Sequence, residues 1–164
     1  MKLGIMQGRL LPTFKDQYQS HPIGYWKEEF DIASSIEIKK IEFIIDAYLY
    51  AQNPILSDKG IIEIEKKSKI TGVSVSSICA DIFMVWPLQK ISSSEINIYG
   101  NLIEKMIKNL SRLGGSDIVI PFVDNSKLES SKDFANIVSF LDEFESLTNK
   151  LNVNLALETD LKPK

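Results

Sequence analysis

The sequence predicts an α/β fold in which about five parallel strands are covered by four helices. Three observations predict it. Short apolar segments alternate with longer amphipathic ones, the alternation runs along all 164 residues, and the apolar segments are nearly uninterrupted. Uninterrupted apolar strands are typical of sheets with both faces covered, and parallel neighbours need crossover helices between them. We therefore treat residues 1–164 as a single domain.

Helix-capping residues mark the ends of several predicted helices. The second predicted helix begins at a capping residue, Ser57, and ends at Gly72. The third begins with the Ser-x-x-Glu pattern of a capping box at Ser92 and is stopped by Gly114 and the glycine after it. Residues 81–90 are expected to form a loop. The predicted strands are residues 2–6, 39–46, 73–80, 116–123 and 153–159, and the predicted helices are residues 25–36, 57–72, 92–113 and 130–151.

Two architectures share this order of elements. One is part of an eight-stranded (β/α)₈ TIM barrel, which typically takes about 250 residues. The other is an open, flavodoxin-like parallel sheet, which is complete with five strands. The segment after the first strand is QGRLLP, and it lacks the G-x-G-x-x-G pattern of a dinucleotide-binding sheet.

Composition excludes several classes of partner. The net charge is −3 and only Arg9 and Arg112 are arginines, so a cationic surface for nucleic acid is not expected. No apolar run approaches membrane-spanning length, and the first ten residues lack the apolar core of a signal peptide. Cys79 is the only cysteine, which rules out an internal disulfide and fits the cytoplasm.

Five segments, in order, resemble the xylose isomerase-like sugar-phosphate isomerase/epimerase family. They are KLGIMQGRLLP, WKEEFDIASSIEIKKIEFIID, NPILSDKG, VSVSSICADIFM and LALETD. The resemblance covers nearly the whole chain and implies the N-terminal portion of a TIM barrel. It also implies a divalent metal (Mn, Mg, Zn or Co) at the carboxyl ends of the strands, and proton transfer next to a sugar carbonyl.

The resemblance assigns one metal-ligand position to this chain. Glu158, at the end of the fifth strand, matches the family's metal-binding glutamate. The other usual ligands, an aspartate, a histidine and a second glutamate, come from strands six to eight, which this chain does not have. His21 is the only histidine; it lies in the first long loop, and we expect it on the surface. Glu37 stands where the family usually has a glycine before the second strand.

The residues themselves place Glu158 at the mouth of a barrel. Asn154, Ala156 and Glu158 alternate with larger apolar residues, and this small or polar set fits the barrel interior. The alternative is an exposed glutamate at a frayed end. Together with this placement, the resemblance implies that Glu158 is the catalytic and metal-binding residue of a complete barrel.

Five other residues are candidates for substrate binding, each with a structural alternative. Gln7 and Arg9 follow the first strand, where Arg9 offers a bidentate fork to a phosphate or pairs with a surface acid. Glu42 lies inside an apolar strand and needs a polar interior or a structural partner. Asp81 contacts sugar hydroxyls or starts a loop turn, and Trp86 forms a wall against a sugar or covers the end of the sheet.

Two functions from different classes remain open. The first is a metal-dependent sugar or sugar-phosphate isomerase or epimerase when the barrel is complete, with this chain alone inactive. The second is a non-catalytic binding or assembly module that keeps the fold. The exposed edges of a partial barrel predict completion by further chain, capping by the Trp86 loop, or a homodimer. The endonuclease branch of the fold needs several histidines and a cationic groove, and the sequence supplies neither.

Overall fold

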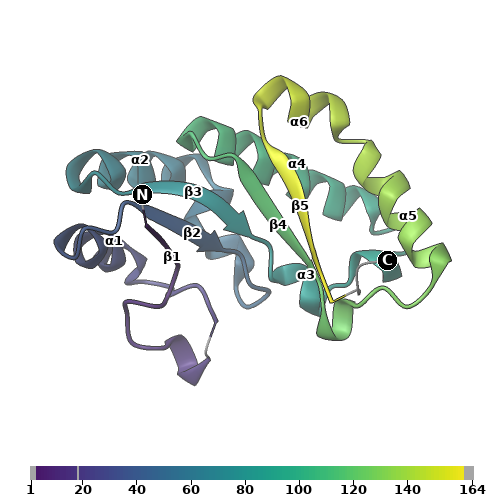
Figure 1. Cartoon of the computed structure of the whole chain (residues 1–164), viewed down its shortest axis with the longest axis horizontal. Helices are drawn as coiled ribbons and strands as arrows, with labels where there is room; N and C mark the ends of the chain where they lie inside the picture. The colour runs from purple at the N-terminus through teal and green to yellow at the C-terminus, as the bar shows by residue number, and fades with distance from the viewer. Residues whose placement is uncertain (1–2, 18, 161–164) are drawn as a thin grey trace.

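The strands form a sheet whose order follows the chain. The computed structural model describes residues 3–17 and 19–160. Within them a five-stranded, all-parallel sheet has the order β1-β2-β3-β4-β5 (Figure 1). The strands are β1 (Gly4–Met6), β2 (Lys40–Ile44), β3 (Ser74–Cys79), β4 (Asp117–Phe122) and β5 (Asn154–Thr159).

This strand order decides between the two predicted architectures. A doubly wound sheet reverses its order at a switch point and carries helices on both faces. Here each new strand is added beside the last one, and right-handed crossovers then place the connecting helices on one side. The arrangement is that of a partial TIM barrel, and the open flavodoxin-like alternative is wrong.

The helices cover the outer face of the sheet and bury one core with it. They are α1 (Trp26–Ser35), α2 (Asp58–Thr71), the short α3 (Ile82–Val85), α4 (Ile96–Leu113), α5 (Ser131–Asp142) and α6 (Glu145–Leu151). Alternate strand residues such as Phe43, Ile78 and Ile120 belong to this core. Their neighbours Glu42 and Cys79 are directed to the opposite, inner face, because side chains alternate along a strand.

Three helix predictions need correction. The predicted helix 130–151 is two helices, because the chain turns at Phe144 and buries its ring near Gly100 of α4. The predicted loop after β3 contains α3. The Ser92–Glu95 pattern closes a turn, with the Ser92 backbone N–H donating to the Glu95 carboxylate, and α4 begins only at Ile96.

The end of α1 has a glutamate in a backbone conformation that favours glycine. Glu37 adopts a left-handed backbone with φ 60°. The backbone N–H of Ile38 donates to Ala33 and that of Glu37 donates to Ser34, the hydrogen-bond pair of a Schellman motif. A glutamate therefore occupies a position where glycine avoids the clash of its Cβ atom.

Candidate functional site

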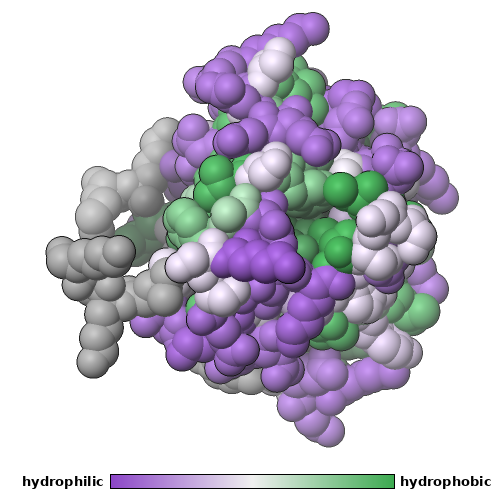
Figure 2. Space-filling model, turned by 90° about the vertical axis from the view of Figure 1, so that its right-hand side faces the viewer, coloured by the Kyte–Doolittle hydropathy of each residue, from purple (hydrophilic) through white to green (hydrophobic). Residues whose placement is uncertain are grey.

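The inner face of the sheet collects polar side chains. Glu42 of β2 lies beside Ser77 of β3, whose hydroxyl donates to the Glu42 carboxylate at 2.7 Å. Glu158 of β5 is in register with Pro121 of β4 and is exposed. Figure 2 views the side of the molecule that lies on the right in Figure 1, the side towards which the strands run, and shows apolar surface there among hydrophilic residues.

The strand register indicates that Glu158 shares this inner face, because Cys79 pairs with Val119, Val119 pairs with Ala156, and Glu158 lies two residues beyond Ala156. Burial, and then the neighbouring Asp81 carboxylate, raise the pKa of the Cys79 thiol far above its usual value. The carboxylates of Glu42 and Glu158 add smaller contributions in the same direction. Asp81, which follows β3, lies on the same side because its carboxylate accepts a hydrogen bond from Cys79.

A hydrogen-bonded chain joins the loop after β1 to the end of β3. Nη2 of Arg9 donates to Oε1 of Gln19 at 3.2 Å, and Nε2 of Gln19 donates to Oδ2 of Asp81 at 2.7 Å. Cys79 donates to the other Asp81 oxygen at 2.9 Å. Burial raises the pKa of Asp81, although these hydrogen bonds oppose the shift. Arg9 and Asp81, two of the candidate residues, are thereby held together through Gln19.

His21 is buried, and the expectation of a surface histidine is wrong. Only 2% of it is exposed. Its Nδ1 lies 2.9 Å from Oε1 of Gln7, and the centre of its ring lies 5.7 Å from the centre of the Phe43 ring. Its backbone N–H donates to the Asp46 carboxylate at 2.7 Å. Burial lowers the pKa of His21 to about 4, so the ring is neutral at pH 7.

Gln7 links the first loop to the second strand. Its side chain is 1% exposed, and Oε1 accepts a hydrogen bond from the Ile44 backbone N–H at 3.2 Å. Its Nε2 is buried and has no hydrogen-bond partner in the described part of the chain. The amide oxygen of Gln7 therefore holds the end of β1 against β2 and His21.

Sequence reasoning missed Glu29, a charged residue inside the apolar stripe of α1. Its side chain is fully buried. Its two oxygens accept hydrogen bonds from the backbone N–H groups of Gly8 at 2.8 Å and Leu10 at 3.1 Å, on either side of Arg9. Burial raises the pKa of Glu29, and these backbone donors oppose the shift. The signal was available, because Glu29 lies three residues after Trp26 and next to Phe30, on the buried side of the helix.

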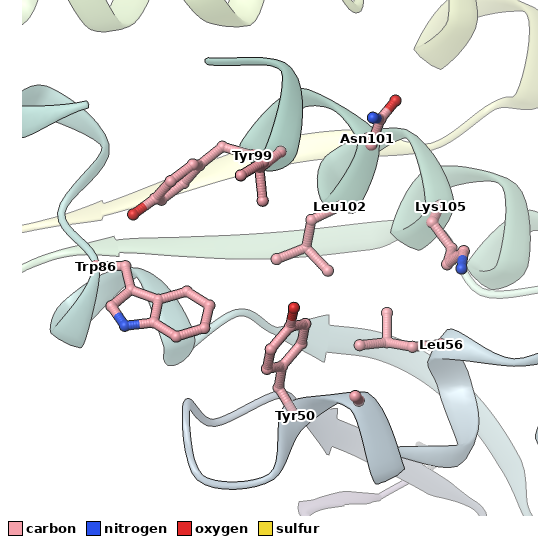
Figure 3. Close-up of a pocket in the computed structure, with 9 residues that line it drawn as sticks. Tyr50, Leu56, Trp86, Tyr99, Asn101, Leu102 and Lys105 are labelled. Atoms are coloured by element: carbon pink, nitrogen blue, oxygen red, sulfur yellow. The ribbon is translucent and has the colours of Figure 1, made fainter. Parts of the chain in front are cut away.

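Trp86 lies apart from the other candidates. Its ring meets Tyr50 at 5.2 Å and Tyr99 at 6.3 Å between ring centres, both nearly edge-on. These three rings line a pocket at the start of α4, shown in Figure 3, to which Gln7, Arg9, Glu42, Asp81 and Glu158 do not contribute.

The described residues do not by themselves fit a catalytic divalent metal. Such a site takes about three protein ligands and leaves a position open. Residues 3–17 and 19–160 contain no group of three or more His, Cys, Asp or Glu side chains close enough to hold one ion. The ring of His21 is held by Gln7.

Comparison with known proteins identifies solved structures of similar fold. No protein-family model matches the chain, and neither does any curated protein. Among solved structures, D-psicose 3-epimerase from Clostridium cellulolyticum H10 superposes with a TM-score of 0.68 at 16% identity over 96% of this chain. The 3-keto-D-glucoside 4-epimerase YcjR from E. coli superposes with a TM-score of 0.65 at 17% sequence identity over 96% of this chain. IolI protein, solved with a zinc atom, superposes with a TM-score of 0.65 at 15% sequence identity over 97% of this chain.

The chain has the fold of the xylose isomerase-like TIM barrels. It covers 52% of the psicose epimerase, 55% of YcjR and 51% of IolI, so it spans about half the length of these proteins. The inner face described above therefore corresponds to the inner wall of such a barrel. In the described part of this chain, no helix is long and apolar enough to cross a membrane.

Proposed function

We propose that this chain forms part of a sugar or sugar-phosphate isomerase or epimerase that transfers a proton next to a carbonyl. The observation that supports the proposal is the placement of Glu42, Asp81 and Glu158 on the inner side of a sheet with sequential strand order. In TIM barrels, active sites are built at the carboxyl ends of the strands. Solved structures of similar fold are described as sugar epimerases, two of them with D-fructose or D-tagatose.

Glu158 is the proposed catalytic group and the one metal ligand that this chain would contribute. Its carboxylate is exposed on a strand end, which leaves it accessible to a substrate. A bound divalent ion would stabilise negative charge that develops on a sugar oxygen. Because the described donor set is too small for that ion, we propose that the remaining ligands lie outside this chain and that the chain alone is inactive.

The proposed substrate contacts come from β2 and from the segments that follow β1 and β3. Glu42 and Asp81 offer acceptors for sugar hydroxyls, and the buried amide of Gln7 fixes the loop that carries Arg9. Arg9 is the proposed contact for a phosphate, since a guanidinium binds phosphate oxygens in a bidentate way. Trp86, placed in a different pocket, is not part of this proposed set.

Solvent deuterium exchange tests the proposal. A proton transfer next to a carbonyl incorporates deuterium from D₂O into a ketose, which NMR detects without knowledge of the product. The test uses the product of the whole reading frame with Mn²⁺, D-fructose, D-psicose, D-tagatose and their phosphates. We expect exchange into at least one of them and none with this chain alone. Absence of exchange into every sugar would contradict the enzymatic proposal.

The second candidate function is a non-catalytic binding or assembly module, favoured by the small donor set of this chain. It predicts that millimolar Mn²⁺ leaves the melting temperature of the chain unchanged, since a ligand stabilises a protein only by binding its folded state. It also predicts association through the open edges at β1 and β5, such as a homodimer, which size measurement in solution detects. A monomeric chain stabilised by Mn²⁺ would contradict this second function.

A further inference from the structure

A second pocket, separate from the inner face of the sheet, lies between α4 and the loop that follows β2. It has a volume of about 310 Å³, which is within the range of small-molecule sites. Figure 3 shows Tyr50 and Leu56 on one side, Leu102 and Lys105 of α4 on the other, and Trp86 closing one end. The aliphatic side chains and the aromatic rings make most of its wall apolar.

The aromatic wall is held in place by its own contacts. The Trp86 ring meets Tyr50 at an interplanar angle of 83° and Tyr99 at 67°. Tyr99 in turn stacks on Phe83, whose side chain is fully buried in the core. Edge-to-face pairs of this kind are favourable, so a flat ligand would meet a preformed surface.

The charged lining of this pocket is positive. Among the residues that the structure describes, Lys105 is the only charged one that lines it. Lys105 makes no hydrogen bond or ion pair within the described part of the chain, whereas Lys108, one turn later on α4, pairs with Glu104. An uncompensated ammonium group beside an apolar wall favours an anion, and it disfavours a cation that would otherwise be attracted to the aromatic faces.

We propose that this pocket binds a small aromatic carboxylate, with its ring against Trp86 and Tyr50 and its carboxylate towards Lys105. A sugar is a poor fit, because its many hydroxyl groups need more hydrogen-bond partners than this apolar wall supplies. The site is therefore distinct from the proposed sugar site, and this proposal does not depend on the proposed function.

The two tryptophans of the chain provide a site-specific test. In a ¹H–¹⁵N spectrum the indole N–H groups of Trp26 and Trp86 give two signals, which a Trp26→Phe variant assigns. Trp26 is buried in the core, so it reports general effects only. Titration with 2-naphthoate is expected to shift the Trp86 signal and leave the Trp26 signal in place. Neutral 2-naphthamide, of the same shape, is expected to bind about 5-fold more weakly, the factor expected for a partly exposed charge pair.

Variants separate the charge from the ring. Lys105→Met should weaken 2-naphthoate binding about 5-fold without affecting 2-naphthamide, whereas Lys108→Met, the matched control, should change neither. For Trp86, whose indole signal is lost on substitution, binding is followed by calorimetry. Trp86→Ala should weaken both ligands about 10-fold or more, and Trp86→Phe should restore much of the loss.

Three outcomes would overturn the proposal. One is a Trp86 signal that stays in place with several millimolar 2-naphthoate. Another is equal binding of naphthoate and naphthamide, or equal effects of the two lysine variants. The third is a Trp86 shift with glucose 6-phosphate, which would make this pocket part of a sugar site. None of these outcomes bears on deuterium exchange at the inner face, so the two proposals fail separately.

Discussion

Nδ1 of His21 lies 2.9 Å from Oε1 of Gln7, and both side chains are almost completely buried. Because the Gln7 oxygen also accepts from the Ile44 backbone, the neutral ring donates from Nδ1. This contact packs the long loop after β1 onto β2, beneath the candidate site. The position of Arg9 thus depends on a histidine that has no part in the proposed chemistry.

Acid should loosen this loop. Burial lowers the pKa of His21 from 6.5 to about 4, so the unfolded chain binds a proton more readily than the folded one between these values. Folding stability therefore falls as pH drops through this window, by about 3 kcal/mol in total. Urea unfolding of the wild type and His21→Gln between pH 7 and 4 should show this loss as the difference between the two proteins.

The comparison with His21→Gln is needed because other groups act in the opposite direction. Burial raises the pKa values of Glu29 and Asp81, so their contributions favour the folded state at low pH and are lost as pH rises through the raised values. The single histidine also gives one isolated ring signal by NMR. A midpoint near 6.5 for that signal would contradict the burial of His21.

Substitution of Glu29 should lower the free energy of unfolding more than substitution of its neighbour Glu28. Glu29→Gln replaces one accepting oxygen by an NH₂ group that faces a backbone N–H of the loop. Loss of one hydrogen bond and an unpaired buried donor should cost about 1–3 kcal/mol. Glu28→Gln, on the exposed side of the same turn, should change stability by less than about 0.5 kcal/mol. Urea midpoints measure both, and equal effects would show that the Glu29 carboxylate does not hold the loop.

Glu37→Gly should stabilise the protein. Glu37 has a φ of 60°. This conformation is about 1 kcal/mol less favourable for a residue with a Cβ atom than for glycine, which adopts it freely. We expect a gain of about 1 kcal/mol in the free energy of unfolding. Glu37→Ala keeps a Cβ atom and should bring no such gain, so a matching increase in Glu37→Ala would assign the effect to the lost charge instead.

Gly8 and Gly24 form a matched pair for the loop after β1. Both have positive φ, 84° and 91°, but a Cβ atom on Gly8 would lie 2.9 Å from the Ser20 backbone oxygen, whereas one on Gly24 would meet nothing within 4 Å. Gly24→Ala should therefore cost about 1 kcal/mol for the backbone conformation alone. Gly8→Ala should cost more, by about 1–2 kcal/mol, because the backbone must move. Similar losses in thermal unfolding would mean that the contact with Ser20 is not tight.

The sequence predicts the strands better than the loops. Apolar runs identify all five strands, because burial on both faces leaves a strong compositional signal; Lys2, the first residue of the first predicted strand, lies outside the described residues. The helix break at Phe144 was missed, since its apolar residues keep helical spacing across the turn and only the packing against α4 favours two helices.

The buried polar contacts were the hardest to predict. His21 precedes a proline in a long loop, which is typical of a surface residue, and only the folded loop brings it to Gln7 and Phe43. Trp86 was predicted to form a wall against a sugar or to cover the end of the sheet, and its contacts with Tyr50 and Tyr99 could not be predicted from the sequence. Glu158 and Glu42 share a face because strand alternation, which the sequence does contain, sets their direction. Asp81 follows β3, and its hydrogen bonds with Cys79 and Gln19 hold it on the same side.

The most direct test of the proposed function is the effect of Glu158→Gln on Mn²⁺-dependent deuterium exchange by the product of the whole reading frame. Glu145→Gln, on α6 of the outer layer, is the matched control. We predict a loss of exchange of at least about 100-fold in Glu158→Gln, the scale of a lost acid–base group, and no change in Glu145→Gln. Exchange that continues at the wild-type rate in Glu158→Gln would contradict a catalytic role for this carboxylate.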